Sequence, residues 1–320
     1  MKQKIFIITG LLLLLVIVFF ISKDLFFPKG DDNANPYEYD LDKLKKSDSL
    51  EVAFKEIKQF KPGLEEIYGI AVDKSDRIYV SGNNGVEIFD NSGKLEKKFS
   101  VSGIARSIQV DNSGKIFLGM EDHIEIFDIT GKRIGKWKHE SISSILTSIA
   151  VTPTDVFVAD AGEKLVYHYD HKGKLINRIG EKDPQNNIPG FVIPSQYFDL
   201  GISHSGLLWI VDPGRHALMN FSYDGKVISS WSKASMGVDG FCGCCNPSNF
   251  AFLSDGSFIT SEKGIERIKV YLPEGTYKYL VATPDSFEEG TKGLDLAVDS
   301  QDRILVLDPV KKKVRFFVKK

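Results

Sequence analysis

Apolar and polar residues alternate with a period of two in short runs along most of the chain. Each run ends in a turn that is rich in Gly, Asp or Asn. The clearest pairs of runs are residues 70–80 with 86–94 and residues 108–118 with 124–132. Alternation of this kind predicts β-strands with one buried face, and the Gly-containing turns predict hairpins. We therefore predict an all-β protein.

The strand pattern recurs six times, and a repeat indicates an architecture more firmly than any single strand does. The residues expected to close the first strand of each copy are Asp73, Asp111, Thr152, Ser203, Ser254 and Asp299. Their spacing of roughly 38 to 51 residues is close to the length of one four-stranded propeller blade. This spacing predicts a six-bladed β-propeller over residues 50–320.

The sixth copy has no fourth strand of its own, because the chain ends at Lys320 after the third. Residues 50–60 precede the first copy and carry strand-like apolar positions. Pairing this segment with the sixth blade would complete the blade and remove an exposed sheet edge. We therefore predict that an N-terminal outer strand closes the ring.

The repeats resemble those of the NHL-repeat family of six-bladed propellers. The resemblance lies in an Asp-x-x-Gly turn, a third strand ending in Phe-Asp-x-x-Gly-Lys, and a second strand ending in Asp, as at Asp160, Asp212 and Asp308. It covers roughly residues 50–320 and implies the propeller fold. It implies no single activity, because such propellers serve as scaffolds, lyases and hydrolases.

An uncharged apolar run occupies residues 5–21, after a four-residue N-terminus that contains Lys2 and Lys4. Its length is at the lower end of the roughly 17 to 25 residues that span a bilayer. A cleaved signal peptide is the alternative, but no small-x-small site follows closely and no Cys offers a lipid attachment point. We therefore favour an uncleaved single-pass anchor with residues 1–4 in the cytoplasm. Residues 22–49 would be a polar tether that holds the propeller on the periplasmic or extracellular side.

Charge and motif content narrow the class of partner. The net charge is −2, and the 41 basic and 43 acidic residues are interspersed, so we expect no nucleic-acid partner. The sequence has no Ser-His-Asp motif, no Gly-rich phosphate loop and no His-rich metal signature. These absences favour a binding or scaffold module over an enzyme. Its ligand would be a protein or a small molecule.

All three cysteines, Cys242, Cys244 and Cys245, fall in the predicted connection between the fourth and fifth blades. That connection lies on the propeller face that also carries the loops between second and third strands, so we expect the cysteines at one mouth of the channel. Cys242 and Cys245 have the spacing of a structural or redox disulfide, whereas adjacent Cys244 and Cys245 could form only a strained one. Two or three thiolates could instead bind a soft metal such as Cu(I) or zinc, with further ligands from elsewhere.

The cysteine segment also extends the family resemblance. Residues 243–247 and 261–264 resemble a bacterial subgroup of NHL-like proteins with a Cys-Cys-Asn-Pro loop. The resemblance names a subgroup and supplies no activity.

Several charged residues are expected on the same face as the cysteines. Asp212 is most simply a turn-capping residue, whereas Glu262, Lys263 and Arg267 depart from the pattern of the other blades. The full set predicted to surround a ligand or partner site is Arg106, Asp212, Arg215, His216, Glu262, Lys263 and Arg267.

Two alternatives to a binding module stay open. One is a metal-binding or redox accessory protein that uses the cysteine cluster. The other is a propeller hydrolase or lyase with a metal in its channel. Asp199, Asn249 and Asp295 lie near the starts of inner strands and offer the oxygen ligands that Ca²⁺ prefers. Lactonase-like propellers hold Ca²⁺ with such side chains, whereas NHL-type amidating lyases use channel histidines that these strand starts lack.

Overall fold

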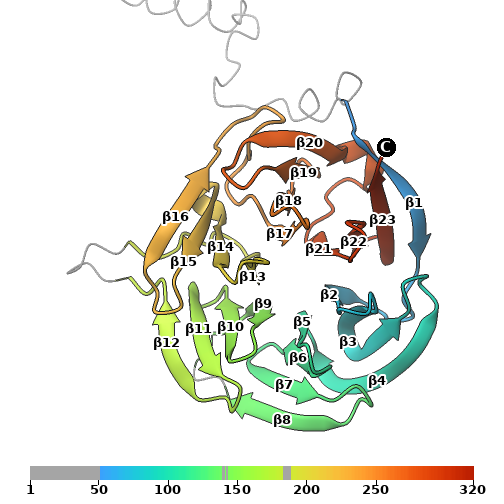
Figure 1. Ribbon diagram of the computed structural model, residues 1–320, viewed down its shortest axis with the longest axis vertical. Coiled ribbons are helices and arrows are strands. Elements are labelled where there is room, and N and C mark those ends of the chain that lie inside the picture. Colours follow the sequence, from blue (N-terminus) through green and yellow to red (C-terminus); the bar gives the residue numbers. More distant parts are fainter. Residues whose placement is uncertain (1–50, 139–140, 142, 183–188) are drawn as a thin grey trace, which may run out of the picture. The chain divides into compact units, whose positions relative to one another are not determined.

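The computed structural model describes residues 51–320 except residues 139–140, 142 and 183–188. The described residues form six β-sheets arranged as blades around a central channel (Figure 1). The prediction of an all-β, six-bladed propeller is confirmed. The predicted anchor and tether lie outside the described residues. Within the described part, no helix is long and apolar enough to cross a membrane.

Each blade is an antiparallel sheet whose first strand lines the channel. The strands of the first three blades are β2 (Ile67–Val72), β3 (Ile78–Phe89) and β4 (Leu95–Ile104); β5 (Ser107–Val110), β6 (Ile116–Gly119), β7 (His123–Phe127) and β8 (Arg133–Lys138); and β9 (Leu146–Val151), β10 (Asp155–Asp160), β11 (Leu165–Asp170) and β12 (Leu175–Ile179).

The remaining blades repeat this arrangement, with two short 3-10 helices between strands, η1 (Pro213–Arg215) and η2 (Pro284–Ser286). Their strands are β13 (Leu200–Ile202), β14 (Leu208–Asp212), β15 (Ala217–Phe221) and β16 (Val227–Ser232); β17 (Asn249–Phe252), β18 (Phe258–Ser261), β19 (Ile268–Tyr271) and β20 (Tyr277–Ala282); and β21 (Asp295–Val298), β22 (Ile304–Asp308), β23 (Lys313–Lys319) and β1 (Phe54–Phe60).

Aspartate side chains close many of the turns between strands. In the first blade, the Asp73 carboxylate accepts hydrogen bonds from the amides of Ser75 and Arg77, at 2.8 and 3.0 Å. The same two contacts, to amides two and four residues later, recur at Asp90, Asp111, Asp128, Asp170 and Asp299. The carboxylate bonds backbone groups that the tight turn would leave unpaired, which is why Asp recurs at these positions.

The fifth blade departs from the predicted turn position by one residue. The Leu253 amide donates to the Ser257 carbonyl, as the Asp73 amide does to Arg77 in the first blade. Leu253, and not Ser254, therefore closes the first strand of this blade. Leu has no acceptor in its side chain, and here Asp255 accepts the Ser257 hydrogen bond instead, at 2.8 Å.

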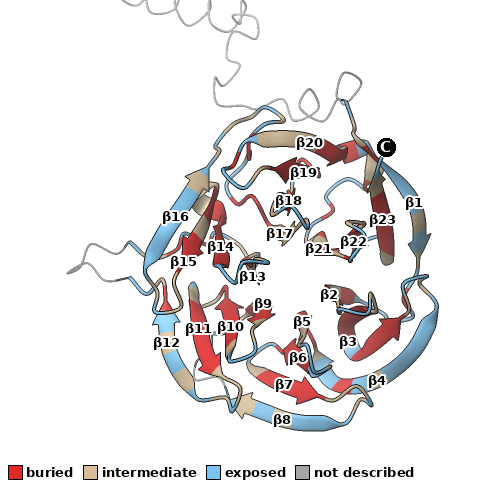
Figure 2. Cartoon of the chain, viewed as in Figure 1, coloured by how far each residue is buried: buried red, intermediate tan, exposed pale blue. Residues whose placement is uncertain are grey.

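Burial decreases from the middle strands of each blade to the outer strands (Figure 2). Every residue of β14 and β22 is buried, whereas β4 begins with four exposed residues. Aromatic rings fill the space between the fourth and fifth blades. The Trp231 ring lies 6.0 Å from that of Phe241 and 5.2 Å from that of Tyr271. This packing fixes Phe241, the residue that precedes the first cysteine.

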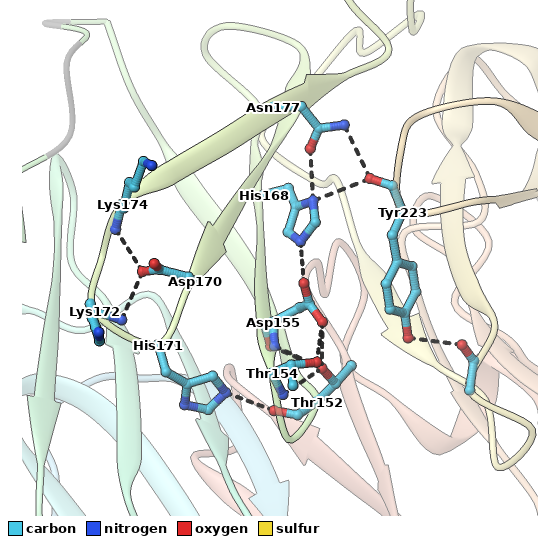
Figure 3. A network of polar contacts seen from close by, with 11 residues as sticks. Thr152, Thr154, Asp155, His168, Asp170, His171, Lys172, Lys174, Asn177 and Tyr223 are labelled. Atoms are coloured by element: carbon cyan, nitrogen blue, oxygen red, sulfur yellow. Dashed lines mark hydrogen bonds and ion pairs between the residues drawn. The ribbon is translucent and has the colours of Figure 1, made fainter.

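Polar contacts also join neighbouring blades. Between the third and fourth blades, His168 lies 2.6 Å from the Asp155 carboxylate and 2.7 Å from the Asn177 side chain (Figure 3). The other partner of its Nδ1 atom is the Tyr223 carbonyl of the fourth blade, at 3.1 Å. The His168 ring also stacks on Phe157, with centroids 4.4 Å apart. His168 itself is buried, and the partly buried network around it joins the two blades.

The N-terminal strand closes the ring as predicted. β1 pairs antiparallel with β23, and Glu56 forms an ion pair with Arg315 at 2.6 Å. The strand is shorter than predicted, because the chain before Phe54 turns to the fifth blade. There Val52 forms a bridge with Leu280, and the Ala53 amide donates to the Leu280 carbonyl at 3.0 Å.

Candidate functional site

Six residues occupy matching positions on the inner strands and encircle the channel. We call this ring the waist; it consists of Gly69, Ser107, Ser148, Asp199, Asn249 and Asp295, of which Asp199 directly precedes its strand β13. Several waist side chains reach the inner strand of the next blade. Asp199 accepts a hydrogen bond from the Phe250 amide, and Asp295 accepts one from the Ile70 amide, both at 2.8 Å. The waist therefore contributes to blade-to-blade contact as well as to the channel wall.

The two waist carboxylates are electrostatically coupled. Burial raises the pKa of Asp199 to about 6, against hydrogen bonds from Ser148 and two amides. Burial, with the nearby negative charge of Asp199, raises the pKa of Asp295 to about 7. Two like charges in a low-dielectric site repel, so near neutral pH the pair favours a retained proton or a bound cation.

Asn249 completes the predicted calcium set at this level of the channel. Its Nδ2 atom lies 3.4 Å from Asp295, and its buried Oδ1 has no hydrogen-bond partner among the described residues. The structure thus brings the three predicted ligands to neighbouring blades of one ring. No cluster of three or more His, Cys, Asp or Glu side chains suited to a metal occurs in the described part. Calcium here would need further carbonyl or water oxygens to reach its usual six to eight ligands.

Two cavities line the channel, one on each side of the waist. The first, of about 200 Å³, lies toward the starts of the inner strands, and its polar lining residues include Tyr68, Arg106, Gln196, Tyr197, Asn249 and Lys292. We call it the mouth cavity. The second, of about 250 Å³, lies toward the strand ends, and its polar lining residues include Ser107, Gln109, Ser148, Asp199, His204 and Asp295. Only the mouth cavity contains basic side chains of Arg or Lys among its described lining residues.

The mouth cavity adjoins the segment 241–247, which we call the Cys loop. Lys263 connects the two, because its ammonium lies 4.9 Å from the centre of the Tyr197 ring and 2.9 Å from the Ser195 hydroxyl. Buried Asn246 anchors the loop itself. Its side chain donates to the carbonyls of Cys242 and Lys263 and accepts from the Lys263 amide, at 2.7, 3.0 and 2.9 Å. The Cys loop is therefore fixed against the fifth blade beside the mouth.

A buried ion cluster lies under the first cysteine. We define it as Glu262, Arg267 and Lys269, all at most 2% exposed. Arg267 donates to Glu262 at 3.0 Å, and Lys269 pairs with the other carboxylate oxygen. The Cys242 sulfur lies 3.6 Å from Arg267 and 3.9 Å from Glu262. Burial and the charge of Glu262 raise the pKa of Cys242, so this thiol stays protonated.

The other two cysteines form a separate pair. Their sulfur atoms lie 3.2 Å apart, and all three cysteines are free. Cys244 is exposed and Cys245 is buried. Burial would raise the pKa of Cys245, but hydrogen bonds from Lys263, Cys244 and Ser195 and the Lys263 charge lower it overall. The hydrogen bond to Cys245, and its charge, raise the pKa of Cys244. Buried Cys245 is therefore the one of the two that ionises more readily, and exposed Cys244 the one that keeps its proton to higher pH.

Asp212, Arg215 and His216 were also predicted to surround a ligand, and each contacts another part of the chain. Asp212 is fully buried, accepts from the Val192 amide at 3.1 Å and pairs with Arg215, which also donates to the Gly190 carbonyl at 2.7 Å. These two residues thus fasten the segment before the fourth blade. His216 contacts the Asn246 carbonyl at 3.1 Å and so supports the Cys loop.

Of the residues predicted to surround a ligand or partner site, Arg106 lines the mouth cavity itself. It pairs with Glu121 at 3.1 Å, and its side chain is 26% exposed. Its Nε atom is buried and has no hydrogen-bond partner within the described part of the chain.

Sequence reasoning did not single out Ser195, Tyr197, Asn246, Lys269 and Lys292. Lys269 carried a usable signal, because it interrupts the apolar run of a third strand at a position that faces Glu262. Ser195 and Tyr197 carried none, since they belong to a long connection whose path the repeat does not specify.

Solved structures support the propeller fold and carry no argument about the function of this chain. A streptogramin B lyase is similar with a TM-score of 0.60 and 13% identity, over 83% of this chain and 98% of that chain. Virginiamycin B lyase from Staphylococcus aureus is similar in two structures, one selenomethionine-substituted and one of a catalytically inactive variant with quinupristin. Each has a TM-score of 0.57 and 11% identity, over 83% of this chain and 100% of that chain.

The search of protein-family models and the search of curated proteins gave no match. The NHL-repeat assignment therefore stays a resemblance. The described residues share the β-propeller fold of these lyases.

Proposed function

We propose that this protein is a ligand-binding propeller that holds a small organic anion in the mouth cavity beside the Cys loop. The unpartnered Nε atom of Arg106 carries the proposal. A buried donor without a partner costs about 1 to 3 kcal/mol, and an anionic oxygen in the cavity would recover that energy.

The rest of the lining favours the same ligand class. Arg106 and Lys292 are the charged residues of the mouth cavity, and Tyr68 and Tyr197 offer aromatic surface. The unpartnered Asn249 oxygen adds one acceptor at the inner end. This set suits a molecule with a carboxylate-like group, an apolar or planar body and one hydrogen-bond donor.

The test is a thermal-shift and calorimetric titration with a panel of aromatic carboxylates, using aromatic amines of equal size as the control ligands. We expect carboxylates to raise the melting temperature and Arg106→Met to weaken their binding at least tenfold. The matched control is Arg133→Met, since Arg133 lies on an outer strand and pairs with Glu125 at 2.7 Å. Equal binding of amines and carboxylates, or full binding by Arg106→Met, would disprove the proposal.

We further propose that residues 5–21 anchor the chain in the cell membrane, with the propeller on the extracytoplasmic side. The support is the uncharged run after two lysines and the polar stretch at residues 22–49. The test is fractionation of cells followed by external protease. We expect the full-length chain in the membrane fraction and the propeller accessible from outside. Recovery of the chain in the soluble fraction would refute the anchor.

A second candidate is a propeller hydrolase or lyase that uses the waist. The observation that favours it is the coupled pair Asp199 and Asp295, whose raised pKa values are typical of functional carboxyls. A cation held with Asn249 would neutralise their repulsion. The test is the effect of Ca²⁺ at pH 8 on the melting temperature. A rise that the Asp295→Asn variant lacks would support a waist cation, and no rise in the unaltered protein would exclude calcium there.

A further inference from the structure

The adjacent cysteines have chemistry of their own, apart from ligand binding at the mouth. We propose that Cys244 and Cys245 are a redox-active dithiol that reduces disulfides reaching the Cys-loop face and is itself oxidised to a vicinal disulfide. The proposal is independent of any ligand in the mouth cavity. It also separates these two residues from Cys242, although the sequence spacing favoured Cys242 and Cys245 as partners.

The distance between the sulfur atoms favours redox exchange over metal binding. The 3.2 Å separation is longer than the roughly 2.05 Å of a disulfide bond. It is shorter than the roughly 3.8 Å that two thiolates would have on tetrahedral zinc with Zn–S bonds of about 2.3 Å. The two sulfurs are therefore at hydrogen-bond distance from each other.

The surroundings assign different roles to the two sulfurs. Cys244 is the exposed one, so it is the thiol that an external disulfide can reach. Cys245 is buried against Lys263 and Ser195, whose hydrogen bonds and charge stabilise its thiolate. Thiolates are the reactive form of cysteine. Cys245 is thus suited to resolve a mixed disulfide that forms on Cys244.

The reaction balances with the disulfide as the oxidant. The Cys244 proton passes to Cys245, and the Cys244 thiolate attacks one sulfur of the substrate disulfide, which releases one substrate thiolate. That thiolate takes the proton from Cys245. The Cys245 thiolate then attacks the Cys244 sulfur and expels the second substrate thiolate. Two electrons move from the cysteine pair to the substrate, and a Cys244–Cys245 disulfide forms.

The product would be a reversible disulfide. Adjacent Cα atoms are about 3.8 Å apart across a trans peptide, below the usual disulfide range of about 4.4 to 6.8 Å. Such a bond is strained, and strained, exposed disulfides have more oxidising potentials and are readily reduced. The dithiol is therefore a weak reductant, and the vicinal disulfide forms only while oxidised substrate is in large excess over thiols. The site would cycle between two states, in contrast to a disulfide that fastens the loop permanently.

Cys242 is excluded from this cycle by its own contacts. Its sulfur partners are Arg267 and Glu262 in the buried ion cluster, and neither contacts the Cys244–Cys245 pair. It is 5% exposed, so external disulfides do not reach it.

The experiment treats the reduced full-length chain with oxidised glutathione, quenches the reaction with acid and maps the thiols by alkylation and mass spectrometry. We expect two thiols to disappear together, with residues 244 and 245 joined and Cys242 alkylated only after unfolding. Cys245→Ser should stop as a stable glutathione adduct on Cys244. Cys244→Ser should not react in the folded state, and Cys242→Ser should react as the unaltered chain does.

A second variant tests the positioning role of Lys263. Without the ammonium, the Cys245 pKa should rise, so at pH 7 the resolving step should slow. In Lys263→Met, the Cys244 adduct should therefore accumulate, and the pH profile of the resolving step should move upward. Lys226→Met is the matched control, since the Lys226 side chain is 83% exposed in the fourth blade.

Three results would overturn the proposal. The first is a disulfide between Cys242 and Cys245. The second is three unreacted thiols in an excess of oxidised glutathione. The third is a soft metal ion that co-purifies with the reduced pair and blocks the reaction, because it would make the pair a metal site.

Discussion

Aspartate takes two opposite roles in this protein, and the surroundings of each carboxylate decide which. At the exposed turns, hydrogen bonds from the Ser92 and Thr130 side chains lower the pKa values of Asp90 and Asp128 respectively. At the waist, burial raises the pKa values of Asp199 and Asp295. The sequence places all four at ends or starts of strands, so position alone does not separate turn formers from channel residues. The separation requires knowledge of which residues become buried.

The waist pair gives stability a defined dependence on pH. Because the folded pKa values are raised from the usual 3.8 to about 6 and about 7, the folded state binds more protons than the unfolded state between about pH 4 and about pH 7. Stability from this pair is therefore fully present below about pH 4 and is lost as the pH rises through the folded pKa values. We expect urea denaturation to show a free energy of unfolding that this pair lowers from about pH 4 to about pH 7. Asp295→Asn should flatten this slope, and an unchanged slope in the variant would contradict the assignment.

The buried ion cluster predicts a large effect from one small substitution. Glu262→Gln would leave Arg267 and Lys269 buried without a counter-charge, and such losses cost about 3 to 5 kcal/mol. Urea denaturation should show this drop. Asp255→Asn is the matched control, because Asp255 is 52% exposed and lies 3.4 Å from Lys278. Its loss should cost at most about 1 kcal/mol. Equal effects of the two variants would show that Glu262 does not balance the cluster.

Strands and turns were the part of the structure that the sequence predicted best. Period-two alternation depends on one buried face per strand, and the propeller supplies that face to nearly every strand. Individual turn positions and strand boundaries were predicted wrongly where side chains did not follow the pattern. Leu253 replaces the usual turn acceptor, and β3 runs through Gly82 and Gly85 without a break between second and third strands. The channel residues Asp199 and Asp295 were found because each lies four residues before the residue that closes the inner strand of its blade, Ser203 or Asp299.

The closing strand should matter more than its position at the edge of a blade suggests. We compare a chain that begins at residue 50 with one that begins at residue 61. The shorter chain loses the pairing of β1 with β23, the contact of Glu56 with Arg315 and buried Phe54. Loss of a buried Phe side chain alone costs about 3 to 5 kcal/mol. We expect the longer chain to unfold cooperatively and the shorter one to lose at least that much stability or to aggregate. Equal unfolding midpoints would show that β1 is dispensable.

At the scale of the molecule, the architecture was predictable and the mouth cavity was not. A repeat of about 40 residues is sufficient for the ring, because each blade needs only its own strands and a neighbour. The mouth cavity combines Arg106, Tyr197 and Lys292 from three connections that the repeat leaves unspecified. The lyase structures share the propeller fold with this chain at 11 to 13% identity. Function in such folds depends on the connections, and these carry no repeat.

The closing strand β1 is synthesised long before β23, the strand with which it pairs. Glu56 and its partner Arg315 are 259 residues apart, so at about 5 to 20 residues per second the ribosome releases β1 tens of seconds before β23. During that interval β1 has no native strand with which to pair, because β23 has not yet been made. Lys55, Glu56 and Lys58 give it alternating charge at positions that stay largely exposed in the finished ring. Charges of this kind discourage pairing with other nascent chains, so the first strand made is also suited to being the last one paired.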